Sequence, residues 1–280
     1  MGTFELTVSK YAGSDSEVVV PAGVQVIGRR AFANNRGMQN LVLPEGLRVI
    51  EAEAFSACIH LHEVSIPDSV ERIDEAAFKG CRNLLSIKLP AGLRTLPRNM
   101  FLRCRCLRHV EFPSGLVEIG ESCFKHAVRL NFEALPETVE IIGDGAFRDC
   151  TDLDLDHLPR ALDTLGSEAF QDCQSLRAAD LPEGVRWIGQ RCFKDCRSLE
   201  RAVLPEGVTY LEEATFEGCE KLSRVGLPGS LEFIEARAFA GCSALHVDPA
   251  ALKRFEVAPD AFDEKEPVVP QPTLEPGLPQ

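Results

Sequence analysis

Apolar residues recur along this chain with a fixed period of 23 residues. In every unit an apolar residue precedes a regularly placed proline, Ile or Leu stands six residues after that proline, and Phe stands eleven residues after it. The prolines follow one another without insertion or deletion at Pro21, Pro44, Pro67, Pro90, Pro113, Pro136, Pro159, Pro182, Pro205 and Pro228. Such a period predicts a solenoid of ten stacked repeats, with a degenerate unit after them.

Each unit is predicted to contain two extended segments joined by turns. The pattern Leu-x-x-Val-x-Leu-Pro, as in 61–67, alternates inward apolar and outward positions and indicates a short strand. The proline ends that strand, and Pro-x-Gly, as in 44–46, turns the chain. A second extended piece follows, as in 185–188. We expect the Ala-Phe-x-x-Cys stretch after it to form a helical turn on the outer face.

Two ladders of buried side chains are predicted to run through the stacked units, because no unit can bury its apolar residues alone. The first ladder is phenylalanine and includes Phe55, Phe78 and Phe101. The second is cysteine and includes Cys58, Cys81 and Cys104. Eight of the eleven cysteines share this column, and the fifth unit has Ala127 there. A small apolar slot filled by reduced thiols explains the substitution; disulfides between neighbouring coils are the alternative.

The strand pattern, the Ala-Phe pair and the Cys three residues after Phe together resemble the 23-residue leucine-rich repeat of the BspA-like, or Treponema-type, family. The resemblance covers residues 18–262. It implies a leucine-rich-repeat coil or horseshoe with one short concave parallel strand per repeat and short extended and turn segments on the outer face. It also implies binding of a macromolecule, because bacterial relatives are often surface proteins that bind host or matrix proteins, but it names no ligand.

The ends of the chain depart from the repeat. Residues 1–17 contain alternating apolar residues and are predicted to form an N-terminal cap. Residues 263–280 are rich in proline and acids and are predicted to be a disordered tail. The tail contains two Pro-x-x-Pro sequences that an SH3-type groove would accept; a solubilising end without a partner is the simpler interpretation.

Composition narrows the classes of function. The net charge of −13 argues against a nucleic-acid-binding protein, which requires clustered basic residues. The longest apolar runs are far shorter than a membrane span, and no signal peptide is evident at the N-terminus, so we expect a cytoplasmic protein, with a surface location left open. No nucleotide-binding, protease or kinase motif is present, and the six histidines do not cluster. We therefore expect no enzyme, no metal and no cofactor.

The inward strand column is interrupted in the middle of the chain, where Glu133 and Asp156 replace Val or Ile. An unpaired carboxylate in a core would cost several kcal/mol. Phe132 and Leu155 stand one residue earlier, which predicts a local bulge or kink that turns both acids towards solvent. The alternative is that the two acids form a ligand site or, more remotely, an enzyme site.

A positive island interrupts this acidic chain. Between residues 76 and 110 there are eight basic residues and no acid: Lys79, Arg82, Lys88, Arg94, Arg98, Arg103, Arg105 and Arg108. The outward strand positions of a leucine-rich repeat commonly bind partners. The candidate partner-binding residues are Arg82, Lys88, Arg105, Arg108, His109, Phe132 and Leu155, with Arg82 and Arg105 near the strand entrance and the others at outward strand positions.

We interpret the island as a contact for an acidic protein; local drift balanced by nearby acids in three dimensions is the competing interpretation. The expected function is that of a monomeric, non-enzymatic scaffold or adaptor, and the alternative is a BspA-like surface adhesin.

Overall fold

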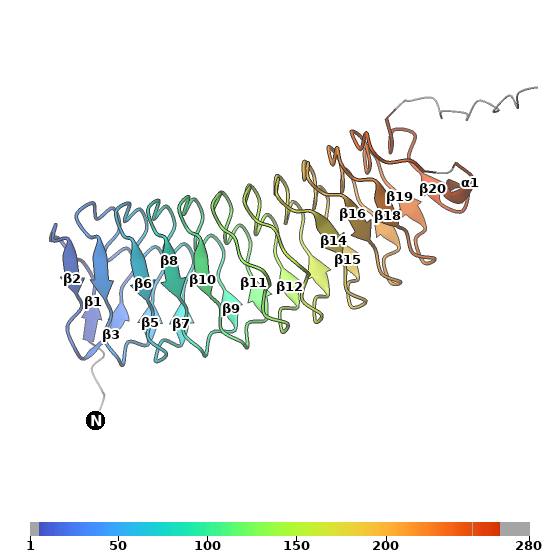
Figure 1. Ribbon diagram of the computed structural model, residues 1–280. Helices are drawn as coiled ribbons and strands as arrows, with labels where there is room; N and C mark the ends of the chain where they lie inside the picture. Colours follow the sequence, from blue (N-terminus) through green and yellow to red (C-terminus); the bar gives the residue numbers. More distant parts are fainter. Residues whose placement is uncertain (1–5, 248, 264–280) are drawn as a thin grey trace, which may run out of the picture.

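The computed structural model describes residues 6–247 and 249–263. The chain winds into coils that stack side by side in one direction, and the array bends in its C-terminal half (Figure 1). Each coil repeats the same path at an interval of 23 residues, so equivalent residues of successive coils are neighbours. The predicted leucine-rich-repeat solenoid is confirmed.

One strand of three residues per coil builds the first kind of sheet. Near the N-terminus the order is β10-β8-β6-β4-β2, all parallel. These strands are β2 (Glu17–Val19), β4 (Asn40–Val42), β6 (Glu63–Ser65), β8 (Ser86–Lys88) and β10 (His109–Glu111). A second sheet, β14-β16-β18, contains β14 (Ala178–Asp180), β16 (Arg201–Val203) and β18 (Arg224–Gly226). We call the outer surface of these strands, and of the coils between them, the long-strand face.

Shorter parallel strands pair on another side of the coils. The first group is β1 (Leu6–Val8), β3 (Val24–Ile27), β5 (Val49–Ile50) and β7 (Arg72–Ile73). The second is β9 (Thr95–Leu96), β11 (Glu118–Ile119), β12 (Ile141–Ile142), β13 (Thr164–Leu165) and β15 (Trp187–Ile188). The third is β17 (Tyr210–Leu211), β19 (Phe233–Ile234) and β20 (Glu256–Val257). Helix α1 (Pro249–Leu252) lies between β19 and β20 along the chain. Strand β1 pairs with β3 at the N-terminal end, where a cap was expected.

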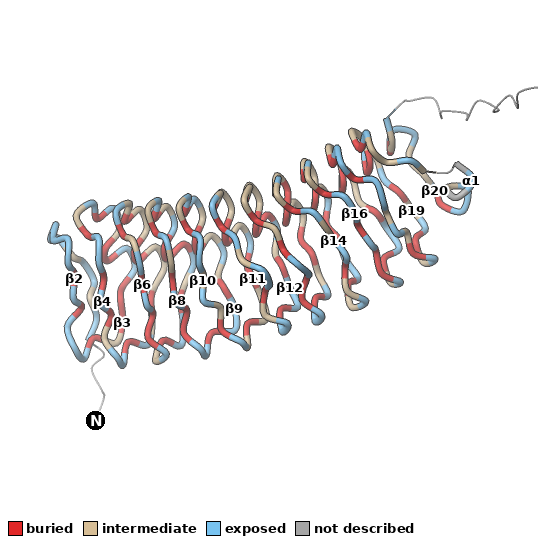
Figure 2. The backbone as a smooth tube through the Cα atoms, viewed as in Figure 1, coloured by how far each residue is buried: buried red, intermediate tan, exposed pale blue. Residues whose placement is uncertain are grey.

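The core is a set of side-chain ladders between these sheets, and Figure 2 shows the buried segments running through every coil. Phe55, Phe78 and Phe101 are fully buried, and their rings stack with centroids 5.2 and 5.9 Å apart. The same stacking continues from Phe32 to Phe262. Because each ring needs a neighbour on both faces, stability comes from the contacts between coils.

The outer segment around each phenylalanine is not helical, and the predicted helical turn is wrong. Two residues per coil adopt a left-handed backbone conformation, one two positions before Phe and one two positions after it, as at Glu53 (φ 57°) and Ala57 (φ 59°) around Phe55. Alternate backbone N–H groups here donate to the next coil, as from Phe55 to the carbonyl of Ala77 at 2.8 Å. A helix would direct those groups along its own axis, so the intercoil bonds require tight turns instead.

The cysteine column is buried and reduced. All eleven cysteines are free thiols, and ten of them are buried. Burial raises the pKa of Cys104 to about 12, because the low-dielectric core disfavours the thiolate. The geometry therefore matches the predicted packing slot rather than a chain of disulfides.

The long-strand sheet stops at the two acids predicted to disturb it. Residues 131–134 and 154–157 form no strand, which separates β10 from β14. Glu133 and Asp156 are exposed, while Leu155 is 4% exposed and packs in the core. The predicted exchange of inward and outward positions is confirmed, although it removes the strand rather than adding a bulge to it.

Candidate functional site

The basic island lies on the coils that carry β8 and β10. All eight of its side chains are exposed. Within the described residues only Arg98 among them forms an ion pair, with Nε 3.6 Å from the carboxylate of Glu75. The other seven have no carboxylate within ion-pair distance there: Lys79, Arg82, Lys88, Arg94, Arg103, Arg105 and Arg108.

Elsewhere the same fold pairs its charges between coils. Arg48 donates three hydrogen bonds to Glu71 in the same column of the next coil, one from Nε at 3.0 Å and two from Nη2 at 2.9 Å. Lys194 and Glu217 pair in the same way at 2.9 Å, and Glu217 also pairs with Arg237. In these other coils, acids neutralise the cations. The competing interpretation of the island requires the same around its seven cations, where no described acid does so.

Part of the island faces outward from the long strands. Lys88 ends β8, and His109 begins β10 in register with Ser86. Arg108 immediately precedes β10, while Arg82 and Arg105 share one column in adjacent coils. All five of these predicted residues, His109 included, are exposed. Lys79, Arg94 and Arg103 lie on other parts of the same coils.

The two apolar candidates play a different part. Phe132 is half-buried and packs edge-on against Phe112, with ring centroids 5.2 Å apart. Leu155 belongs to the core and forms the floor of a shallow hollow of about 240 Å³. Both residues therefore support the interrupted coils, and Leu155 offers a partner little surface.

The acid pair Glu133 and Asp156 lies open to solvent on adjacent coils. The backbone N–H of Asp156 donates to the carbonyl of Glu133 at 2.9 Å, which connects the coils where the strand is missing. Within residues 6–247 and 249–263, no three His, Cys, Asp or Glu side chains gather as a metal site.

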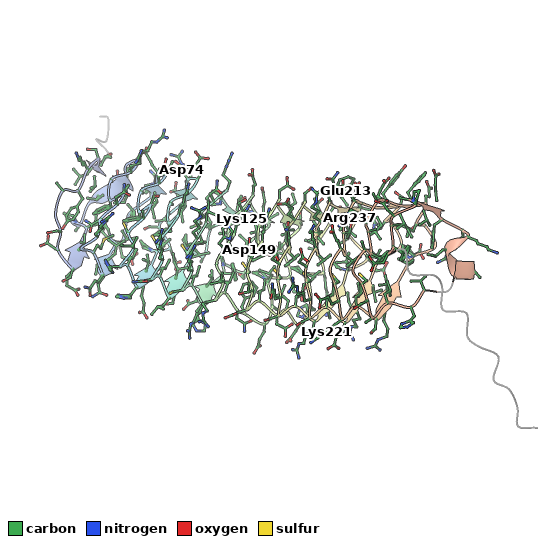
Figure 3. All side chains as sticks on the ribbon, turned by 90° about the horizontal axis from the view of Figure 1, so that it is seen from above. Asp74, Lys125, Asp149, Glu213, Lys221 and Arg237 are labelled. Atoms are coloured by element: carbon green, nitrogen blue, oxygen red, sulfur yellow. The ribbon has the colours of Figure 1, made fainter. Side chains whose placement is uncertain are left out.

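A row of acids lies on the turn side of the central coils. Asp149 is 3.1 Å from Nδ1 of His126, and Figure 3 labels Asp149 and Lys125 in the middle of the array. Burial, followed by the charges of Asp149 and Asp195, raises the pKa of Asp172 above its ordinary value. Burial lowers the pKa of His126, against the attraction of Asp149. Cations lie among these acids, and Arg148 pairs with both Asp149 and Glu168. The central turns therefore balance their charge, in contrast to the seven cations of the basic island that have no ion pair within the described residues.

One feature of the long-strand face was missed from the sequence. A hollow of about 470 Å³ lies beside β18, and its lining includes Arg201, Arg224, Phe239 and Phe262. A signal was present, because Asp248 occupies the inward strand column, as Glu133 and Asp156 do.

The stacked coils, phenylalanine ladder and parallel strands define a leucine-rich repeat protein. The sequence matches the BspA type leucine-rich repeat region, in six copies over residues 10–131 and 117–246. The chain belongs to this family, as the strand and Ala-Phe motifs indicated. No curated protein matches it. No helix in the described part is long and apolar enough to cross a membrane.

Solved structures of similar fold are bacterial. A leucine-rich repeat protein from Bacteroides ovatus is 23% identical, with a TM-score of 0.52 over 90% of this chain and 87% of that one. The pneumococcal vaccine antigen PcpA is 20% identical, with a TM-score of 0.55 over 84% of this chain and 66% of that one. At these identities the likeness concerns the fold.

Proposed function

We propose that this chain is a non-enzymatic protein-interaction module, a scaffold or adaptor, that binds an acidic partner protein on its long-strand face. The observation that carries the proposal is a set of seven exposed cations on two adjacent coils, none of which has an ion-pair partner among the described residues. In a chain of net charge −13, these coils are where an acidic surface would be attracted rather than repelled.

The arrangement of the arginines supports recognition of carboxylates. Arg82 and Arg105 repeat at the coil spacing, and Arg108 lies beside them at the start of β10. Guanidinium groups bind carboxylates through paired hydrogen bonds, and a rigid backbone holds these three in fixed positions. We propose that Lys88 and His109 complete the contact and that the chain acts as a monomer.

The test is capture of partners from an extract of the source cells, followed by mass spectrometry. The variant Arg82→Glu/Arg105→Glu/Arg108→Glu reverses the long-strand cations. Its matched control is Lys79→Glu/Arg94→Glu/Arg103→Glu, which changes the net charge equally on the same coils but away from the long-strand face. Loss of a reproducible acidic partner with the first variant alone supports the proposal. Equal capture by both variants and the unaltered chain contradicts it.

A second candidate is a surface adhesin, favoured by family membership and by the vaccine antigen that shares the fold. The adhesin and the scaffold differ in where the protein lies in the cell. Fractionation of cells, with a protease applied to intact cells, separates the two candidates. A chain digested from outside supports the adhesin, and a chain protected until lysis supports the intracellular scaffold.

A further inference from the structure

Strand β18 ends the second long-strand sheet. Within the described residues it pairs with β16 alone, so its other edge is open. The chain enters helix α1 where the next strand would continue, and Pro249 has no backbone N–H to offer a strand ladder. This edge is therefore a template for an added strand.

The hydrogen-bond ladder shows which groups face outward. Arg224 donates its backbone N–H to Glu200 at 3.3 Å, and the carbonyl of Gly226 accepts from Leu204 at 2.9 Å. Residues 224 and 226 thus bond towards β16. Because backbone direction alternates along a strand, the N–H and C=O of Val225 face the open edge.

An apolar hollow lies directly beside this edge. Its volume is about 470 Å³, and Val225, Leu227, Phe239, Leu245 and Phe262 contribute to its lining. Phe239 and Phe262 belong to the stacked ladder, with ring centroids 5.1 Å apart, so the floor of the hollow is rigid. A side chain pointing inward from an added strand would fill this space.

The mouth of the hollow is basic. Arg201 and Arg224 lie in register on adjacent strands, which places like charges side by side. Arg201 is neutralised by Asp180 at 2.6 Å, but Arg224 has no ion pair within the described residues. In other columns of this fold the next coil supplies the counter-charge, as Glu71 does for Arg48 at 2.9 Å. No described residue does so for Arg224, and an acid on an added strand would occupy that place.

We propose that the open edge of β18 binds an extended segment of a partner protein by β-strand addition. The segment alternates acidic and apolar residues, with an acid beside Arg224 and an apolar side chain in the hollow. Main-chain bonds to Val225 fix the strand, and the hollow and the arginine select its sequence. This site is separate from the basic island on β8 and β10 and does not depend on it.

The probe is a fluorescein-labelled hexapeptide of alternating glutamate and valine with blocked ends, and its lysine–valine counterpart is the charge control. Fluorescence polarisation with the full chain should show saturable binding of the glutamate peptide only. Arg224→Glu should weaken that binding at least tenfold and should give the lysine peptide the affinity that the glutamate peptide lost. Arg82→Glu should change neither.

The backbone contact is tested separately. In hydrogen exchange the Val225 amide should exchange fast in the free chain and slow on binding, and Val225→Pro should abolish peptide binding. The circular dichroism spectrum establishes whether Val225→Pro folds. The hydrogen-exchange measurement uses the unaltered chain and therefore does not depend on that variant. Absence of saturable binding, equal binding by Arg224→Glu, or a Val225 amide already protected by the chain's own residues would each overturn the proposal. Since Arg224→Glu should leave capture through the basic island intact, failure here leaves the proposed function standing.

Discussion

The thiol of Cys81 donates a hydrogen bond to the backbone carbonyl of Phe55 in the preceding coil, 3.2 Å away. The same bond recurs in eight coils, for instance from Cys104 to Phe78 at 3.1 Å. It explains why cysteine, rather than any small apolar residue, fills the column: the thiol packs as a hydrophobe and also satisfies a carbonyl.

The fifth coil has its buried thiol at another position. Ala127 occupies the column and makes no such bond, but Cys123 is fully buried four residues earlier. Coil eight buries thiols at both equivalent positions, Cys192 and Cys196, so the position of Cys123 is a second thiol site beside the column.

This second site predicts weak coupling between the two positions. Cys123→Ala should destabilise the chain by about 1–2 kcal/mol through a small cavity. Ala127→Cys should be tolerated, because coil eight already buries thiols at both equivalent positions, Cys192 and Cys196, and Cys196 makes the bond to the preceding coil. The double variant should therefore show nearly the sum of the two effects. Urea unfolding of the four proteins measures the cycle, and a large loss from Ala127→Cys would contradict the second site.

Burial should also decide thiol reactivity. Cys106 is half-buried, whereas the other ten cysteines are buried. Because the thiolate is the reactive species, the native chain should react with a thiol reagent at Cys106 first and at about one equivalent near pH 8. Full reaction should require denaturant. The variant Cys106→Ser should lose the fast equivalent, and rapid labelling of several thiols in the native chain would contradict the buried column.

The same burial makes stability depend on alkaline pH. Burial raises the pKa of Cys81, Cys173 and Cys196 well above their ordinary value of 9.0 in the folded chain. Above pH 9 the unfolded chain loses thiol protons that the folded chain keeps, so stability falls as pH rises. Below about pH 8 this contribution is constant. Each thiol adds a slope that approaches about 1.4 kcal/mol per pH unit.

Urea midpoints measured from pH 7.5 to pH 10 should follow this decline. A variant with Cys150→Ala and Cys173→Ala should show a shallower slope, although it is less stable at every pH. Equal slopes in the two proteins would show that other groups cause the alkaline loss.

The fold was predictable because the same residue type recurs at the same position of every repeat. Buried positions at a fixed period leave few alternatives to stacked coils. The turns were less predictable. Their left-handed positions are occupied by residues such as Arg30, Glu53 and Ala76 instead of glycine alone, so no local signal marked them. The intercoil hydrogen bonds that impose this geometry are tertiary contacts.

The site was predictable only in part. The charge of Arg82, Arg105 and Arg108 was visible in the sequence, but only the folded arrangement shows that no carboxylate of the described residues lies within ion-pair distance of them. Beside the open edge of β18 the chain begins helix α1 at Pro249, which has no backbone N–H for a strand ladder. The effect of that proline on a neighbouring strand emerges only when the strand pairing is known.

The exchanged register in the sixth coil can be tested directly. Leu155 is 4% exposed and Asp156 is exposed, so Leu155→Ala should cost about 2–5 kcal/mol and Asp156→Ala less than about 0.5 kcal/mol. In the regular coil of β8 the columns are reversed: Ile87→Ala should be costly and Ser86→Ala mild. Thermal unfolding of the four variants compares them. A large loss from Asp156→Ala would place that acid in a structural role instead.

The left-handed turn positions offer a final test, in which stability can be raised as well as lowered. Ala57 (φ 59°) carries a side chain where Gly80 (φ 74°) occupies the same column one coil later. A side chain in this conformation costs about 1–2 kcal/mol, while glycine adds unfolded-state entropy worth about 0.5–1 kcal/mol. Ala57→Gly should therefore stabilise the chain slightly.

The reverse change should act in the opposite direction. Gly145 has φ 58°, and an added Cβ would lie 3.5 Å from Oγ of Ser122, an ordinary contact. Gly145→Ala therefore isolates backbone strain from steric overlap and should destabilise the chain by about 1 kcal/mol. Urea midpoints of the two variants should move in opposite directions. A shift of the same sign in both would show that the turns do not hold these residues in the left-handed region in solution.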